Sequence, residues 1–177
     1  MFERTYRLIK LFEKSGSVAG RKKLQKIVYV LQSLGYSYGM DYTYCHYGPY
    51  SSQLQFEVDR LAEKGLIDER LFCHTYQYSI TKDGQELVKF LDEKKVGTDR
   101  IEVPEDLLRE LIKQDAQFLE LVATIIYVKN LGYDSEKTEQ KLRELKPNLM
   151  DRYLEALDFI NKIGGYACLN GLLRYSD

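Results

Sequence analysis

The stretch LIDERLFCHTYQYSITKDG, residues 66–84, decides the fold class of this chain. Tyr76, Tyr78 and Ile80 alternate with polar residues, which is the pattern of a strand with one buried face. Residues 66–80 are therefore predicted to form a β-hairpin with its turn near residues 72–75. Thr81 follows directly and is a favourable cap for a helix, so the hairpin should lead straight into one.

Three helices and one strand are predicted before this hairpin. The second helix is the clearest, because Leu24, Ile27, Val28 and Leu31 follow helical spacing and Gly35 stops it. A strand is expected over residues 42–47, which are rich in aromatic and β-favouring residues. The order helix, helix, strand, helix, hairpin, helix predicts a winged-helix-like domain over residues 1–95, with the strand placed beside the hairpin.

The second half of the chain is predicted to be all helical. Residues 94–103 show no periodicity and are expected to form a linker. Four helices should follow, starting at Pro104 and capped later by Ser135 and Asn148, with an apolar central helix near residues 118–127. The predicted fold is therefore α+β and mostly helical: a winged-helix-like domain with a small antiparallel sheet (1–95), then a helical bundle domain (96–177).

Composition restricts the class of protein. The 177 residues are 44% hydrophobic and 30% charged, which is ordinary for a folded protein. No apolar segment follows Met1, and the longest apolar run is too short to span a bilayer, so neither a secretory signal nor a membrane partner is expected. The three cysteines form no C-x-x-C pair, which favours a reducing, cytoplasmic location.

Three motifs carry a resemblance to a known family. They are GRKKLQKIVY at residues 20–29, YGPYS at 47–51 and LAEKGLI at 61–67. They resemble the YwgA-like family of small proteins without an assigned function, and the similarity continues through FLELVAT at 118–124. More distantly, KLQK followed by a YGP turn resembles the Panacea-type domain of antitoxins and related regulators, over about the first half. Neither resemblance implies a catalytic residue.

The first candidate site is basic. Arg21, Lys22, Lys23 and Lys26 open the second helix, where cations oppose the helix dipole. An anionic group, from a phosphate backbone or an acidic partner, would relieve that repulsion and take the free N–H groups. The alternative is a solvated basic face whose aliphatic stems pack on the core.

The second candidate site is aromatic. Six of the 15 tyrosines lie within residues 36–50, and Tyr47 and Tyr50 flank the turn at Gly48-Pro49. Tyrosine is enriched where proteins contact partners and stacks on bases, so a recognition surface is predicted. Alternatively, every second tyrosine packs on the core and the turn only reverses the chain.

A metal site, a cofactor and a catalytic site are not predicted. Cys45-His46 and Cys73-His74 offer zinc ligands, but neighbours on a strand point to opposite faces, so each pair supplies only one. The cysteines are expected to be small buried apolar groups. With two histidines and no G-x-S-x-G, G-x-G-x-x-G or H-E-x-x-H motif, no enzyme is expected.

Two functions remain open. The favoured one is a non-enzymatic regulatory or adaptor protein that binds a protein partner or itself. The alternative is a DNA-binding regulator that contacts phosphates through the basic start of the second helix. The third helix, which would enter the groove, carries Glu57, Asp59 and Glu63, whereas base readers are usually basic or amide residues. Charge therefore favours a protein partner, with nucleic acid as the other possibility.

Overall fold

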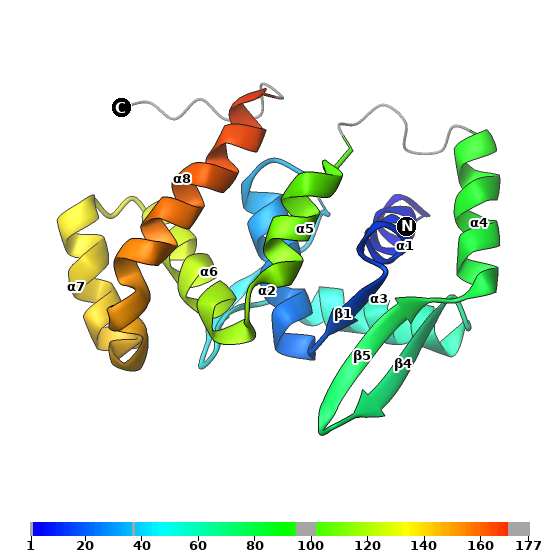
Figure 1. The fold of residues 1–177 in the computed structure, drawn as a ribbon, viewed down its shortest axis with the longest axis horizontal. Helices are drawn as coiled ribbons and strands as arrows, with labels where there is room; N and C mark the ends of the chain where they lie inside the picture. Colours follow the sequence, from blue (N-terminus) through cyan, green and yellow to red (C-terminus); the bar gives the residue numbers. More distant parts are fainter. Residues whose placement is uncertain (1, 37, 95–101, 170–177) are drawn as a thin grey trace.

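The computed structural model describes residues 2–36, 38–94 and 102–169 (Figure 1). Its helices are α1 (Phe2–Ser15), α2 (Arg21–Ser33), α3 (Ser52–Glu63), α4 (Lys82–Glu93), α5 (Glu105–Lys113), α6 (Ala116–Asn130), α7 (Ser135–Leu145), the 3-10 helix η1 (Pro147–Arg152) and α8 (Tyr153–Leu169). Its strands are β1 (Ser17–Ala19), β2 (Thr43–Cys45), β3 (Gly48–Tyr50), β4 (Ile67–Phe72) and β5 (Thr75–Ile80). The chain is therefore mostly helical α+β with a small antiparallel sheet, as predicted.

The predicted hairpin is present as β4 and β5. The two strands pair in antiparallel register from Ile67 opposite Ile80 to Phe72 opposite Thr75, and Cys73 and His74 form the turn. The Thr81 side chain caps α4 by accepting a hydrogen bond from the Gly84 N–H at 3.1 Å. The alternating pattern and the cap were thus sufficient to locate this part of the fold.

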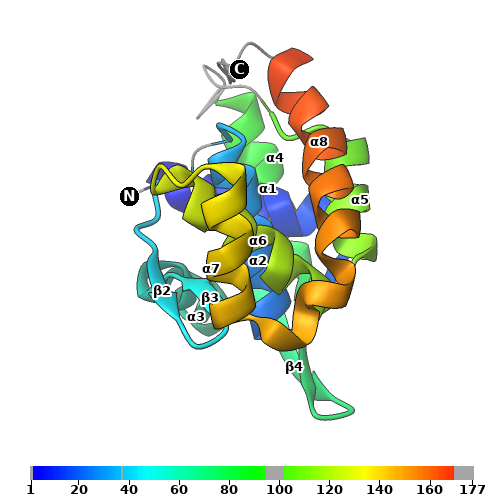
Figure 2. The ribbon, with the colours of Figure 1, turned by 90° about the vertical axis from the view of Figure 1, so that its left-hand side faces the viewer.

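The strand beside this hairpin is not the predicted one. Figure 1 shows β1 against β5, which gives the order β1-β5-β4, whereas the aromatic segment forms a separate two-stranded sheet of β2 and β3. The β2–β3 hairpin lies apart from the β4–β5 hairpin (Figure 2) and packs through β3 on α2 and α6. Placing residues 42–47 beside the β4–β5 hairpin was therefore wrong. The strand that lies there is β1, whose three residues, with Val18 buried, are too few to show alternation in the sequence.

The central contact of the fold joins α2 to α6. Most of α6 is buried, as its nearly continuous apolar sequence predicts, and α2 packs along it. A single cluster of buried apolar side chains includes Leu31 of α2, Val122 of α6 and Ile163 of α8. The predicted boundary at residue 95 and most of the predicted linker lie outside the described residues, and the independence of the two halves stays a prediction.

Several helix starts in the second half differ from those predicted. Pro104 is the residue before α5 rather than its first residue. The cap of α7 is Asp134, whose carboxylate accepts from the Lys137 N–H at 2.8 Å, not Ser135. Asn148 lies inside η1, so it caps no α-helix, and α8 begins only at Tyr153. Among the described helices, none is long and apolar enough to cross a membrane.

Candidate functional site

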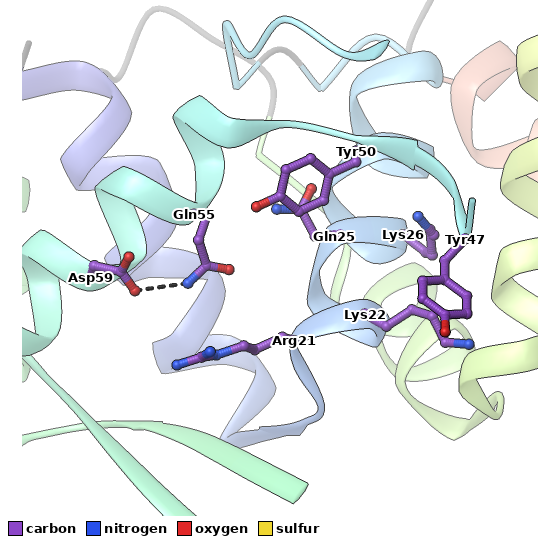
Figure 3. A pocket seen from close by; sticks show the side chains of 8 residues that line it. All are labelled: Arg21, Lys22, Gln25, Lys26, Tyr47, Tyr50, Gln55 and Asp59. Atoms are coloured by element: carbon purple, nitrogen blue, oxygen red, sulfur yellow. Dashed lines mark hydrogen bonds between the residues drawn. The ribbon is translucent and has the colours of Figure 1, made fainter. Parts of the chain in front are cut away.

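A pocket of about 300 Å³ opens where the first turns of α2 meet the β2–β3 hairpin and α3 (Figure 3). It brings together five of the six residues predicted to contact a partner. The lining residues are Arg21, Lys22, Gln25, Lys26, Tyr47, Tyr50, Gln55 and Asp59. We call this site the basic–aromatic pocket. The sixth predicted residue, Lys23, does not line it.

Two buried polar residues fix the walls of this pocket to one another. The Gln25 side chain of α2 donates a hydrogen bond to the Ser51 carbonyl and accepts one from the Ser51 N–H, both at 2.9 Å. The Ser51 hydroxyl in turn caps α3 by accepting from the Leu54 N–H at 3.1 Å. The start of α3 is therefore anchored on α2, which sets the width of the pocket between them.

The first turn of α2 lacks the usual compensation at a helix start. Its N-cap is Gly20, with φ of 104°, so no side chain caps the free N–H groups, and no acidic residue lies in the first turn. A glycine is required there because an L-residue rarely adopts this backbone conformation. The partial positive charge of the helix end is thus left for neighbouring elements or a ligand to balance.

The charge of Arg21 is neutralised by a residue of the β4–β5 hairpin. Its guanidinium donates to a Glu69 carboxylate oxygen at 2.8 Å and to the Tyr78 hydroxyl at 3.1 Å. It also lies 3.9 Å from the centre of the Tyr76 ring. These hydrogen bonds raise the pKa of Arg21 further, so it stays charged. About half of the side chain remains exposed beside the pocket, where it can still meet an anionic group.

The charge of Lys22 is neutralised by a carboxylate from the second half of the chain. Its ammonium donates to Glu120 of α6 at 2.9 Å and lies 4.7 Å from the centre of the Tyr47 ring. Glu120, only 5% exposed, also accepts from Lys146. Burial alone would raise the pKa of Glu120, but hydrogen bonds from Lys146 and Lys22 hold it below its ordinary value. Glu120 is therefore a carboxylate that serves two cations.

Lys26 is the least compensated cation of the pocket. It is 1% exposed, its ammonium donates to the Pro49 carbonyl, and it forms no ion pair within the described residues. Burial lowers its pKa to about 8, while Glu120 opposes that shift and Lys146 adds to it. Lys22 and Lys146 share the Glu120 carboxylate, and the buried Lys26 adds a further positive charge, so that cations outnumber this carboxylate beside the pocket.

The aromatic residues form the exposed side of the pocket. Tyr47 is 58% exposed and Tyr50 is 37% exposed. Figure 3 shows the Tyr47 ring over the Lys22 side chain and Gln55 directed toward Asp59, to which it donates at 2.7 Å. The pocket therefore combines accessible flat apolar surface with cations that are already partly neutralised.

Lys23 points to a different part of the molecule. Its ammonium donates to the Ile112 carbonyl near the end of α5, and burial lowers its pKa. A cation at the C-terminal end of a helix is favourable, so Lys23 ties α2 to α5.

Glu69, Glu120 and Lys146 were not among the predicted site residues. Glu120 alone left a signal, because it is the one charged residue within the apolar run at 118–128. Glu69 and Lys146 have ordinary polar neighbours in the sequence. Glu69 pairs with Arg21, 48 residues away, and Lys146 donates to the His46 carbonyl, 100 residues away. Such distant pairings have no local signature.

The two cysteine–histidine pairs stay apart. Cys45 lies on β2 and Cys73 at the tip of the β4–β5 hairpin, in separate sheets. Both thiols are exposed, so the expectation of buried cysteines was wrong for these two; the Cys168 side chain lies outside the described ones. The expectation assumed that the cysteines pack in the apolar core, but Cys45 ends strand β2 and Cys73 lies in a hairpin turn. Within the described residues, no group of three or more metal-ligating side chains occurs.

Comparisons with known proteins agree with part of the resemblance noted in the motifs. No family model matches the chain. The more distant resemblance to the Panacea-type domain receives no support. The chain is 29% identical over 171 residues to "Uncharacterized protein YwgA" of Bacillus subtilis. That alignment covers 92% of this chain and 98% of the relative, so the two proteins are similar along nearly their whole length.

Proposed function

We propose that this protein is a non-enzymatic regulatory or adaptor protein that binds a protein partner through the basic–aromatic pocket. The observation that carries the proposal is the meeting of Arg21, Lys22, Lys26, Tyr47 and Tyr50 in one concave site. The order α1-β1-α2-β2-β3-α3-β4-β5, with sheet order β1-β5-β4 and β2–β3 as an insertion between α2 and α3, favours a winged-helix scaffold for this site.

The chemistry of the pocket suits a protein better than a polyanion. Tyrosine and arginine are the residues most enriched at interface hot spots, since they offer large contact areas with a polar end. Arg21 and Lys22 already hold Glu69 and Glu120, so the pocket adds little net charge for long-range attraction. An acidic or aromatic side chain of a partner would meet the half-exposed guanidinium of Arg21 and the exposed rings of Tyr47 and Tyr50.

DNA binding is the second candidate. The uncapped first turn of α2 favours it, because a helix N-terminus binds phosphate through its free N–H groups. Asp59 on the pocket wall, and Glu57 and Glu63 on the same helix α3, would repel phosphates. A duplex would therefore have to approach α2 without contact from α3, which reduces the number of phosphates it can engage.

The test is affinity capture from a native lysate with and without nuclease, using three forms of the full chain. They are the natural protein, the double variant Tyr47→Ala/Tyr50→Ala, and the control Tyr133→Ala, which removes an exposed tyrosine outside the pocket. We expect the natural protein and the control to retain the same protein partner after nuclease, and the double variant to lose it.

Two results would contradict the proposal. One is a captured fraction that disappears on nuclease treatment; log affinity for duplex DNA should then fall with log salt by about 0.9 per phosphate neutralised. The other is equal retention of the partner by the double variant, which would place the contact surface elsewhere on the molecule.

A further inference from the structure

A second pocket lies at the opposite end of α2. Its volume is about 420 Å³, and it shares no residue with the basic–aromatic pocket. The ends of α2 and α6 and the segment before β2 form its walls. The lining residues are Tyr29, Gln32, Ser33, Met40, Asp41, Tyr42, Tyr127, Asn130 and Leu131. We call it the aromatic–acidic pocket.

Three tyrosine rings stand at angles to one another in this pocket. The rings of Tyr29 and Tyr42 are 4.9 Å apart at 69°, and those of Tyr29 and Tyr127 are 6.3 Å apart at 44°. A cation is attracted to the electron-rich face of an aromatic ring, and three tyrosines line this pocket. Burial raises the pKa of Tyr29 to about 12 and that of Tyr42 further, so both rings stay neutral.

The polar groups of the pocket favour a cation. Asp41 is exposed, and its carboxylate accepts a hydrogen bond from Gln53 at 2.7 Å but forms no ion pair within the described residues. Among the described residues, no lysine or arginine lines the pocket; Lys129, in the last turn of α6, is not part of the lining. The acid is therefore free to neutralise a ligand's positive charge.

Helix orientation adds to the negative potential. Gln32 and Ser33 are the last residues of α2, and Asn130 is the last residue of α6, so both helices end at this pocket. The C-terminal end of a helix carries about half a negative charge and stabilises cations. α2 thus begins at a pocket with excess positive charge and ends at a pocket with negative potential.

The aromatic–acidic pocket is also preformed and holds an unsatisfied group. The Gln32 side chain donates to the Met40 carbonyl at 2.7 Å and accepts from the Met40 N–H at 3.0 Å, which fixes the segment leading to Asp41. The Tyr42 hydroxyl is buried and has no hydrogen-bond partner among the described residues. A buried hydroxyl without a partner is uncommon.

We propose that the aromatic–acidic pocket binds a cationic nitrogen group, guanidinium or ammonium, carried by a small amine or by a basic side chain of a peptide. The rings of Tyr29, Tyr42 and Tyr127 contact the group by cation–π interaction, and the Asp41 carboxylate neutralises its charge. This site is independent of the basic–aromatic pocket and of the function proposed for it.

The experiment titrates the full chain with four probes while the ring signals of labelled tyrosines are followed by NMR. The probes are N-acetyl-arginine amide, N-acetyl-lysine amide, agmatine, and N-acetyl-citrulline amide as a neutral match for arginine. We expect saturable shifts of the pocket tyrosines with the cations and at least about tenfold weaker binding of the citrulline probe, because only the charge differs. Stronger binding of agmatine than of the capped amino acids would indicate that the cationic group belongs to a small amine. Binding of the capped arginine and lysine as tight as that of agmatine would indicate a basic side chain of a peptide.

Paired variants localise the binding. Tyr127→Phe keeps the ring and should bind as the natural protein does, whereas Tyr127→Leu removes it and should weaken cation binding several-fold. Asp41→Asn, at an exposed position, should weaken it about tenfold. The variant Tyr47→Ala/Tyr50→Ala should leave it unchanged, which separates this site from the basic–aromatic pocket. Three results would each overturn the proposal. They are binding of the citrulline probe as tight as that of the arginine probe, no saturation by any cation, and cation binding by Tyr127→Leu and Asp41→Asn that equals that of the natural protein.

Discussion

Replacing Glu120 by glutamine tests the charge balance on which the basic–aromatic pocket rests. The carboxylate is buried and lies 2.9 Å from the ammonium of Lys22, while Lys146 donates to its other oxygen. Glutamine keeps the shape and one acceptor but removes the only negative charge in hydrogen-bond contact with these two cations among the described residues. Lys146 is then a buried cation with no counter-charge, beside the buried Lys26.

The magnitude follows from the burial of each partner. Removing one member of a buried pair costs about 3–5 kcal/mol, because the remaining charge stays desolvated. Lys146 and Glu120 are both less than a tenth exposed, whereas Lys22 is one-third exposed and contributes less. Since glutamine retains an acceptor, we expect about 3 kcal/mol. For a chain of this length that lowers the melting temperature by roughly 6–12 °C.

The assay is urea and thermal unfolding followed by circular dichroism, with Glu155→Gln as the matched control. Glu155 pairs with Arg152 on the surface, so the control should melt like the natural protein. The loss in Glu120→Gln should persist at high salt, because buried pairs are weakly screened. It should shrink in acid: the folded pKa of Glu120 is lowered, so its contribution disappears as pH falls through that pKa. A loss below about 1 kcal/mol would show that the cluster is solvated and refute the argument.

Three further outcomes are expected. Burial lowers the pKa of Lys26 from 10.5 to about 8, so the unfolded chain holds more protons between these values; the free energy of unfolding should rise as pH is raised from about 8 to about 9.5, and Lys26→Met should remove most of that rise in urea titrations. Gly48→Ala should cost more than the control Gly132→Ala in the same assay, because both have positive φ but only the new Cβ at 48 would lie 2.9 Å from the Thr124 hydroxyl; equal losses would mean that this contact is soft. A fragment of residues 1–95 should melt cooperatively but at a lower temperature than the full chain, since its own helices and sheet pack together while the face of α2 that contacts α6 becomes exposed; a molten fragment in calorimetry would mean that the two halves form one domain.

Local patterns predicted the local elements. The alternation at Tyr76, Tyr78 and Ile80 located β5, and helical spacing with Gly35 located the end of α2. The strand on the other side of β5 from β4 was assigned incorrectly, because its pairing depends on contacts between segments about 60 residues apart, such as Val18 with Tyr78. A three-residue strand has no periodicity from which to predict it.

In the candidate site, too, local sequence patterns predicted single residues but not the long-range contacts between them. The basic residues of the first turn of α2 and the tyrosines beside Gly48-Pro49 could be found because helix starts and turns have residue preferences. The turn itself lies at residues 46 and 47, and Gly48-Pro49 belong to β3. That they share one pocket depends on the Gln25–Ser51 hydrogen bonds, which no pattern in the sequence indicates. Lys23 was predicted with the site but does not line the pocket. It follows Lys22 directly in the basic run, but it faces α5, because successive helix residues point about 100° apart.

The basic and aromatic candidate residues come from the first half of the chain, but residues of the second half support the pocket in which they meet. Glu120 neutralises Lys22, Lys146 donates at 2.6 Å to the His46 carbonyl in the turn between β2 and β3, and Gly48 of that hairpin packs on Thr124. Each contact joins α2 or the hairpin to α6 or the segment before η1. Removing residues 96–177 would therefore leave the cations of the pocket without their shared carboxylate and the hairpin without its support, even if the remaining helices stayed folded. It follows that the helices and the sheet of the first half do not by themselves account for this pocket, because residues of the helical half help to set its charge and its shape.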